Sequence, residues 1–86
     1  MNTLIISTFK CNFKTFKTDI TEFITDMGKE VVSDYKFVKI NKHKSHLFMN
    51  VLNMNALSDQ MNSDKAKEWD QTNECKDTIY KIELVG

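Results

Sequence analysis

The sequence predicts an α+β domain in which a four-stranded antiparallel sheet carries two helices on one face. Three observations predict this class. The hydrophobic patterns run in the order strand, helix, strand, strand, helix, strand, which is typical of a split βαβ arrangement. A chain of 86 residues has room for one domain. Its composition, 41% hydrophobic and 28% charged, is that of a globular protein. We therefore expect a single domain over residues 1–86.

The first strand and the first helix have the clearest patterns. Thr3–Phe9 is apolar on both faces at its start, which is typical of a strand inside a sheet. From Phe13 to Met27 apolar residues recur at three- and four-residue spacing, which predicts an amphipathic helix. Asn12 is the expected N-cap, and Gly28 is expected to end the helix in the left-handed region.

The two faces of this helix make different predictions. Phe16 and Phe23 lie on the apolar face, so we expect them to be among the most buried residues. The carboxylates of Asp19, Glu22 and Asp26 fall on the opposite face among lysines, where we expect solvation rather than acid–base chemistry.

A hairpin of Tyr35–Ile40 and His46–Leu52 is expected to follow. If residues 41–44 form the turn, Ile40 pairs with Ser45 and Val38 pairs with Leu47. Cross-strand partners share a face. The face expected to lie beneath the helices then holds Val38, Ile40, Leu47, Met49 and Val51. The opposite face holds Tyr35, Phe37, Lys39, His46, Phe48, Asn50 and Leu52.

The last third of the chain predicts a helix over Ala56–Trp69 and a strand over Thr78–Val85. Asn53 or Asn55 could cap the helix, and Ser63 is expected to restart it as a second segment. The strand alternates apolar and charged residues, as a half-buried edge strand does. The side chains expected to point inward are Tyr80, Ile82 and Leu84.

Composition excludes several function classes. The net charge is zero, and the twelve residues counted as Lys or Arg are all Lys, so the planar guanidinium that favours phosphate and guanine recognition is missing and we expect no nucleic-acid partner. Gly28 and Gly86 are the only glycines, so there is no glycine-rich phosphate-binding loop. We expect no bound cofactor.

The compartment is expected to be the cytoplasm. No apolar stretch approaches the ~18 residues of a membrane span, and Met1–Phe9 lacks the pattern of a signal peptide, so we expect no membrane association. Cys11 and Cys75 are expected to be free thiols in a reducing compartment.

The segment Asn53–Trp69, with its restart at Ser63 and its aromatic end, resembles the split helix that dimeric α+β barrel proteins place after the third strand. These are ferredoxin-like domains, and the group includes antibiotic-biosynthesis monooxygenase-type domains and small uncharacterised bacterial members. The resemblance implies a ferredoxin-like fold. It also implies a homodimer in which two sheets pack face to face, with a small-molecule cleft in each subunit.

The expected function is a small binding or accessory module of unassigned specificity. One alternative is a cofactor-free monooxygenase or isomerase that acts on a small lipophilic or aromatic ligand. Another is a structural domain that docks on a different protein through its open sheet face. No catalytic set is predicted, and no metal site is either, because His43 and His46 have no third ligand beside them.

Two groups of residues are candidates for a functional role. Small-molecule sites combine aromatic walls with a few polar groups, so the candidate ligand-binding residues are Tyr35, His46, Asn50 and Trp69. A contiguous apolar patch is rarely left exposed on a monomer, so the candidate dimer-interface residues are Tyr35, Phe37, Phe48 and Leu52.

Overall fold

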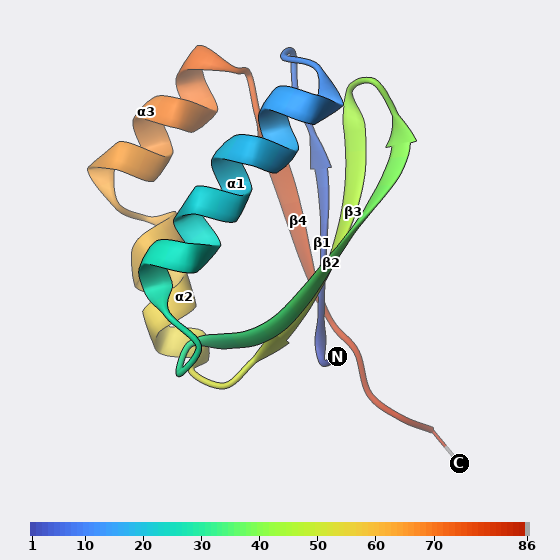
Figure 1. Cartoon of the computed structure of the whole chain (residues 1–86), viewed down its shortest axis with the longest axis vertical. Helices are drawn as coiled ribbons and strands as arrows, with labels where there is room; N and C mark the ends of the chain where they lie inside the picture. Colours follow the sequence, from blue (N-terminus) through green and yellow to red (C-terminus); the bar gives the residue numbers. More distant parts are fainter. Residues whose placement is uncertain (86) are drawn as a thin grey trace.

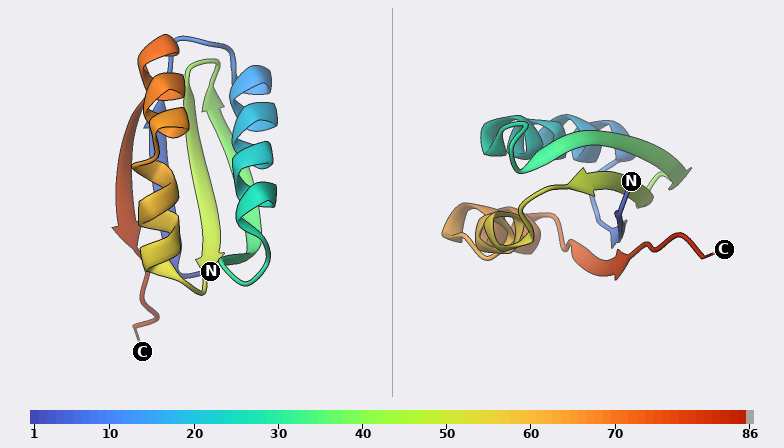
Figure 2. Two further views of the ribbon diagram at one scale, coloured as in Figure 1. Left: turned by 90° about the vertical axis from the view of Figure 1, so that its left-hand side faces the viewer. Right: turned by 90° about the horizontal axis from the view of Figure 1, so that it is seen from below.

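The computed structural model describes residues 1–85 as one antiparallel sheet with its helices on a single face (Figures 1 and 2). The elements are β1 (Thr3–Thr8), α1 (Phe13–Met27), β2 (Val32–Asn41), β3 (Lys44–Val51), α2 (Met54–Met61), α3 (Asp64–Thr72) and β4 (Lys76–Lys81). The α+β class and the order of the elements are confirmed. There are three helices rather than two, because the second predicted helix is divided. None of the helices in this part of the chain has the length and apolar character needed to cross a membrane.

The strand order β2-β3-β1-β4 places β1 and β3 in the centre and β2 and β4 at the edges. Every neighbouring pair is antiparallel. It follows that β1 and β2 run parallel with β3 between them, and that β3 and β4 run parallel with β1 between them. Parallel strands need a crossover connection. Helix α1 forms the crossover from β1 to β2, and α2 and α3 form the crossover from β3 to β4. All three helices cover the same face of the sheet.

The helix ends follow the predicted caps. The side chains of Asn12, Asn53 and Ser63 each accept a hydrogen bond from the backbone N–H three residues further on, at 2.8, 3.0 and 3.2 Å. Asn53 is therefore the cap of α2, and Ser63 restarts the helix as α3. Gly28 ends α1 with a φ of 88°, a backbone conformation that favours glycine.

The β2–β3 hairpin has a different register from the predicted one. Lys39 pairs with Ser45 and Asn41 pairs with Lys44, which leaves Ile40 as a bulged residue in β2. The turn therefore contains two residues, not four. Ile40, which was expected to face the helices, is instead 45% exposed. A bulge adds one residue to one strand and shifts the pairing beyond it by one position.

This shift reverses the two faces of β2. Phe37 pairs with Leu47 and Tyr35 pairs with Met49, so both aromatic side chains lie on the helix side of the sheet. Val38 lies on the open side. The prediction that put Val38 beneath the helices and the two aromatic residues on the open face is wrong. The predicted face of β3 is correct, because Leu47 and Met49 are both buried.

The core lies between the helices and the sheet. It consists of Ile5, Ile24, Val31, Val32, Leu47, Met49, Val51 and Leu57. Phe16 is 2% exposed and its ring stacks on that of Phe9 at a centroid distance of 4.0 Å, which confirms Phe16 as one of the most buried residues. Phe23 is only half-buried, with Lys65 Nζ 5.3 Å from its ring centroid, so the same prediction for Phe23 is wrong.

The last strand is an edge strand, as predicted, but it is not half-buried. It ends at Lys81, and both Ile79 and Tyr80 are nearly half exposed. Leu84 lies beyond the strand and is 97% exposed, so its predicted inward position is wrong. The physical reason is that α3, the helix that precedes β4, buries none of its own residues and gives this edge little cover.

Candidate functional site

A cavity of about 80 Å³ lies between the helix layer and the sheet. Its walls come from all three helices, and its floor comes from the central strands. Among the apolar lining residues are Ile5, Leu47 and Met49 on the sheet and Phe16, Ile20 and Phe23 on α1. The cavity is therefore largely apolar, and it is built from the same residues that the amphipathic pattern of α1 and the alternation of β1 and β3 direct inward.

Three residues of α3 line the cavity, namely Ala66, Trp69 and Asp70. None of the residues of α3 is buried. Trp69 fixes this helix to α1: its ring lies 5.9 Å from the ring of Phe16, and its Nε1 donates a hydrogen bond of 2.9 Å to Oδ2 of Asp19. Asp19 is thus half-buried, and the prediction that it is simply solvated is wrong. Asp19 and Trp69 hold the outer wall of the cavity in place.

One end of the cavity is polar. Ser7, Asp70 and Asp77 line it there, Gln60 lines the cavity from α2, and no basic side chain is among the lining residues. Ser7 is 1% exposed and donates from Oγ to Oδ1 of Asp77 at 2.5 Å. The Sγ of Cys75 donates to the same oxygen at 3.4 Å. The result is a compact acidic cluster at the end of an apolar space.

Burial affects the protonation of two members of this cluster, Asp70 and Cys75. Burial raises the pKa of Asp70 above its ordinary value, and the neighbouring charge of Asp77 raises it further. Burial also raises the pKa of the Cys75 thiol strongly, and Asp77 and Asp70 add to that effect. Cys75 is therefore a protonated thiol at neutral pH and cannot act as a nucleophile, since the thiolate is the reactive form.

Asp70, Cys75 and Asp77 are also the side chains, among residues 1–85, whose ligand atoms come close enough together to hold a metal ion. Their ligand atoms all lie within 4.8 Å of one another. A metal ion bound through all three side chains would have to displace the proton of the Cys75 thiol, whose pKa is raised by burial and by the two aspartates.

The four candidate ligand-binding residues do not come together. Trp69 lines the cavity, on the helix side of the sheet. His46 and Asn50 lie on the open side, where Nδ2 of Asn50 donates to Oγ of Ser33 at 2.7 Å. Tyr35 lies on the helix side, but on the edge strand β2, 37% exposed and outside the cavity. One of the four residues therefore belongs to the candidate site.

The four candidate interface residues do not share a face either. Tyr35 and Phe37 point to the helix side, with their rings in edge contact at 6.0 Å. Phe48 is on the open side. Leu52 follows the end of β3 and is 61% exposed. The single aromatic face was a product of the predicted register, which the bulge in β2 changes.

The open side of the sheet nevertheless carries an apolar surface, made of different residues. Two rows cross all four strands: Lys36–Phe48–Leu4–Tyr80 and Val38–His46–Ile6–Thr78. We call the apolar members the open-face patch: Leu4, Ile6, Val38, Phe48 and Tyr80. All three helices lie on the other face, so no helix covers this patch (Figure 2).

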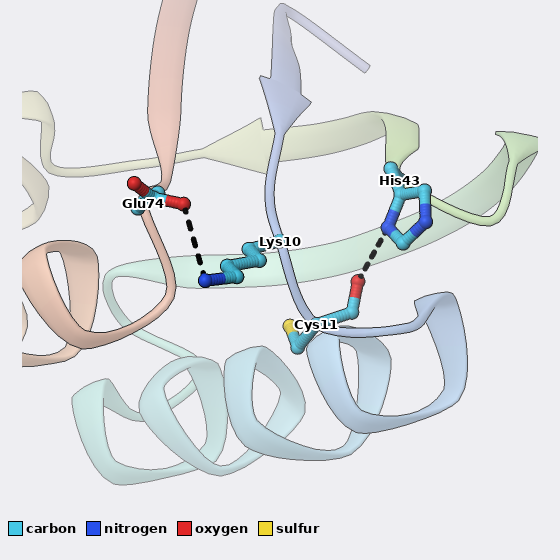
Figure 3. Close-up of polar contacts among 4 residues, drawn as sticks. All are labelled: Lys10, Cys11, His43 and Glu74. Atoms are coloured by element: carbon cyan, nitrogen blue, oxygen red, sulfur yellow. Dashed lines mark hydrogen bonds and ion pairs between the residues drawn. The ribbon is translucent and has the colours of Figure 1, made fainter.

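A second polar cluster joins the loops at one end of the sheet. The Nδ1 of His43 donates to the backbone carbonyl of Cys11 at 3.1 Å, and Lys10 lies 3.9 Å from the carboxylate of Glu74 (Figure 3). The imidazole is directed at the carbonyl oxygen and not at the sulfur. Burial raises the pKa of the Cys11 thiol, and the charge of Asp19 raises it further. This cluster therefore positions loops and does not activate the thiol.

The residues at the polar end of the cavity were not predicted from the sequence. Ser7 is a polar residue within an apolar strand, and Asp77 lies directly opposite it in the β1–β4 pair. The signal that could have found Ser7 is its position on the same face as Thr3 and Ile5 of a central strand, where a hydroxyl must have a partner. Asp70 gave no comparable signal, because it lies on a helix that buries nothing.

No protein-family model matches the chain, and no curated protein matches it either. Among solved structures, the chain is similar to a conserved protein from Methanosarcina mazei Go1. The TM-score is 0.47 and the sequence identity is 14%, over 96% of this chain and 95% of that chain. At this level of similarity, nothing about ligand, activity or assembly carries over.

Proposed function

We propose that the chain is a small binding or accessory module whose ligand occupies the cavity between the helices and the sheet. The observation that carries this proposal is the composition of the cavity, since an apolar space with a few convergent polar groups is the usual form of a small-molecule site. Its volume of about 80 Å³ is roughly half that of the ~150 Å³ apolar cavity known to take benzene. The ligand body is therefore a short alkyl group rather than an aromatic ring.

A cavity-filling variant tests this proposal. Ala66 lines the cavity from α3, so Ala66→Leu should fill part of it. Titration of the wild-type chain with butan-1-ol, followed by two-dimensional NMR, should give saturable shifts at the lining residues, and Ala66→Leu should lose them. Asn55→Leu adds the same side chain to an exposed position of α2 and should bind like the wild type. Absence of saturable shifts, or equal shifts in Ala66→Leu, would overturn the proposal.

We further infer that the domain belongs to the ferredoxin-like, dimeric α+β barrel group and pairs with a second copy through the open-face patch. Two crossovers on one face of a β2-β3-β1-β4 sheet support the fold assignment. The uncovered patch supports the dimer, since exposed contiguous apolar surfaces mark interaction sites. A domain of this size also gains stability from additional burial.

The mass in solution tests the dimer. Light scattering at micromolar concentration should give twice the chain mass of 10.1 kDa. Phe48→Asp places a charge in the centre of the patch and should give a monomer. Met54→Asp places the same charge on an exposed apolar residue of α2, outside the patch, and should leave the dimer intact. A monomeric wild type would overturn the dimer and direct attention to a different protein as the partner of the patch.

The alternative of an enzyme has one observation in its favour. A carboxyl group with a raised pKa beside a second carboxylate, at the end of an apolar cavity, suits general acid–base chemistry. A cofactor-free isomerase would use Asp70 to move a proton on its substrate. The test is deuterium incorporation next to the carbonyl of butan-2-one in D₂O: exchange above background that is lost in Asp70→Asn would favour the enzyme, and background exchange would exclude it for this class of carbonyl compound.

The proposed location is the cytoplasm. Cys11 and Cys75 are both free thiols, which is the usual state in a reducing compartment. Fractionation of the producing cells, with detection of the untagged protein, would test this.

A further inference from the structure

We propose that the ligand of the cavity is a short alkylamine in its protonated form. Its alkyl body would lie among the apolar side chains, and its ammonium group would meet the carboxylates of Asp70 and Asp77. This inference rests on the proposed function above, because it names the chemical class that the same cavity would take.

The negative charge of the polar end favours a positively charged ligand. Two carboxylates line the cavity and no Lys or His does. A charged group that leaves water for an apolar space needs a charged, hydrogen-bonded partner. An ammonium group finds such partners here, whereas a carboxylate would meet two like charges. A neutral hydroxyl would gain a hydrogen bond but no ion pair.

The hydrogen bonds of Asp77 leave room for a ligand donor. Ser7 and Cys75 both donate to its Oδ1. Because Ser7 is almost completely buried on a central strand, this bond holds the carboxylate in a fixed orientation. Within residues 1–85 no side chain donates to Oδ2. An alkylammonium group has three N–H donors, so it can bond to Oδ2 of Asp77 and to the carboxylate of Asp70 at once.

A bound cation would also reduce the repulsion between the carboxylates of the acidic cluster. Asp70 is partly desolvated, and its burial together with the nearby charge of the exposed Asp77 raises its pKa. A bound ammonium group would offset the repulsion between the two carboxylates and favour the charged form of Asp70. This effect is absent for a neutral ligand of the same size, so the two ligands should differ in affinity.

Three probes with the same alkyl body separate the contributions. The full chain is titrated with n-butylamine, butan-1-ol and sodium butyrate at neutral pH, with the signals of the cavity-lining residues and the Trp69 indole N–H as reporters. We expect the amine to bind about tenfold more tightly than the alcohol, an amount typical of one charge-assisted hydrogen bond. Butyrate should give no saturable shift.

Two variants and one control identify the carboxylates. Asp70→Asn and Asp77→Asn keep the shape of the side chains. Each should lower the affinity for butylamine by about tenfold and leave the affinity for butan-1-ol unchanged. Asp59→Asn removes the same charge from an exposed position of α2 and should change neither affinity.

The outcomes separate the two proposals. If the alcohol binds as tightly as the amine and the two Asn variants bind the amine like the wild type, the cavity site stands and the amine inference is wrong. If neither probe gives saturable shifts, the cavity proposal itself fails. Tighter binding of butyrate than of the amine would also overturn the inference.

Discussion

Trp69 on α3 and Asp19 on α1 are joined by a hydrogen bond of 2.9 Å from the indole Nε1 to the carboxylate Oδ2. The bond matters because α3 contributes no buried residue to the core. Together with the contact between the rings of Trp69 and Phe16, it ties the outermost helix to the helix beside it. The position of α3, and with it the outer wall of the cavity, depends on this pair.

Removing the indole donor should loosen α3. Trp69→Phe keeps an aromatic ring but leaves half-buried Asp19 without its donor, so the free energy of unfolding should fall by about 0.5–1.5 kcal/mol. Amide hydrogen exchange in α3 should become faster than in the wild type. Urea denaturation and exchange followed by NMR measure the two effects. Glu22→Gln is an exposed change on the same helix as Asp19 and should alter neither the free energy of unfolding nor the exchange rate. Unchanged amide exchange in Trp69→Phe would show that the bond does not hold α3.

Two phenylalanines of α1 should differ in their importance. Phe16 is 2% exposed and stacked on Phe9, so Phe16→Ala should cost ~3–5 kcal/mol. A domain of this kind has only ~5–15 kcal/mol of stability, so the variant should be close to unfolding at room temperature. Phe23 is half-buried against the cavity, and Phe23→Ala should cost clearly less. Equal losses in chemical denaturation would contradict the burial difference.

The register of the hairpin can be tested by introducing the same charged side chain separately at two adjacent positions. Phe37 points to the helix side and its ring meets the edge of Phe16 at 6.2 Å, so Phe37→Asp should lower the melting temperature severely. Val38 points to the open side, so Val38→Asp should leave the fold of the monomer nearly unchanged. Both variants can be compared by thermal denaturation at low concentration. A reversed order of stability would mean that the pairing lies one residue away.

The acidic cluster should make stability depend on pH in a defined direction. Burial raises the folded-state pKa of Asp70 above its usual value of 3.8, so the folded state holds this proton more tightly than the unfolded state does. The associated stabilisation is complete below pH 3.8 and is lost as the pH rises through the folded-state pKa. At pH 7 the Asp70 carboxylate therefore destabilises the fold.

Asp70→Asn removes this effect. Its melting temperature should exceed that of the wild type at pH 7, and the difference should shrink toward zero at about pH 3, where the wild-type carboxyl is protonated in both states. Asp59→Asn should show no such pH-dependent difference. A wild type that is more stable than Asp70→Asn at pH 7 would contradict the assigned pKa direction.

Short-range sequence signals were sufficient to predict most of the fold. The side chains of Asn12, Asn53 and Ser63 cap their helices through short-range hydrogen bonds, and Gly28 ends α1 through its backbone freedom, so each could be read from a few neighbouring residues. The bulge at Ile40 could not, because a two-residue turn with a bulge and a four-residue turn both fit the residues between Lys39 and Ser45. That one difference moved the side chains of residues 35–39 to the opposite face of the sheet.

The candidate site was harder to predict, because it depends on long-range packing. Asp70 and Ser7 come from opposite ends of the chain and meet only because β4 pairs with β1. Trp69 has the aromatic ring that the wall of a ligand site needs, and it does line the cavity. His46 and Asn50 are polar groups of the kind such a site uses, but their strand turns them to the other face. Composition identified the kinds of residue that a site uses, and the sheet register decided which of them could meet.

The irregularities of β2 also bear on how copies of the domain can aggregate. This strand forms one edge of the sheet, where free backbone groups could add strands from further molecules without limit. Its pairing with β3 is interrupted between Val32 and Asp34 and again between Lys39 and Asn41. Bulges and lysines such as Lys36 and Lys39 make an edge a poor template for a new strand. The same bulge that reversed the side chains of β2 therefore also guards the sheet against growth into fibres.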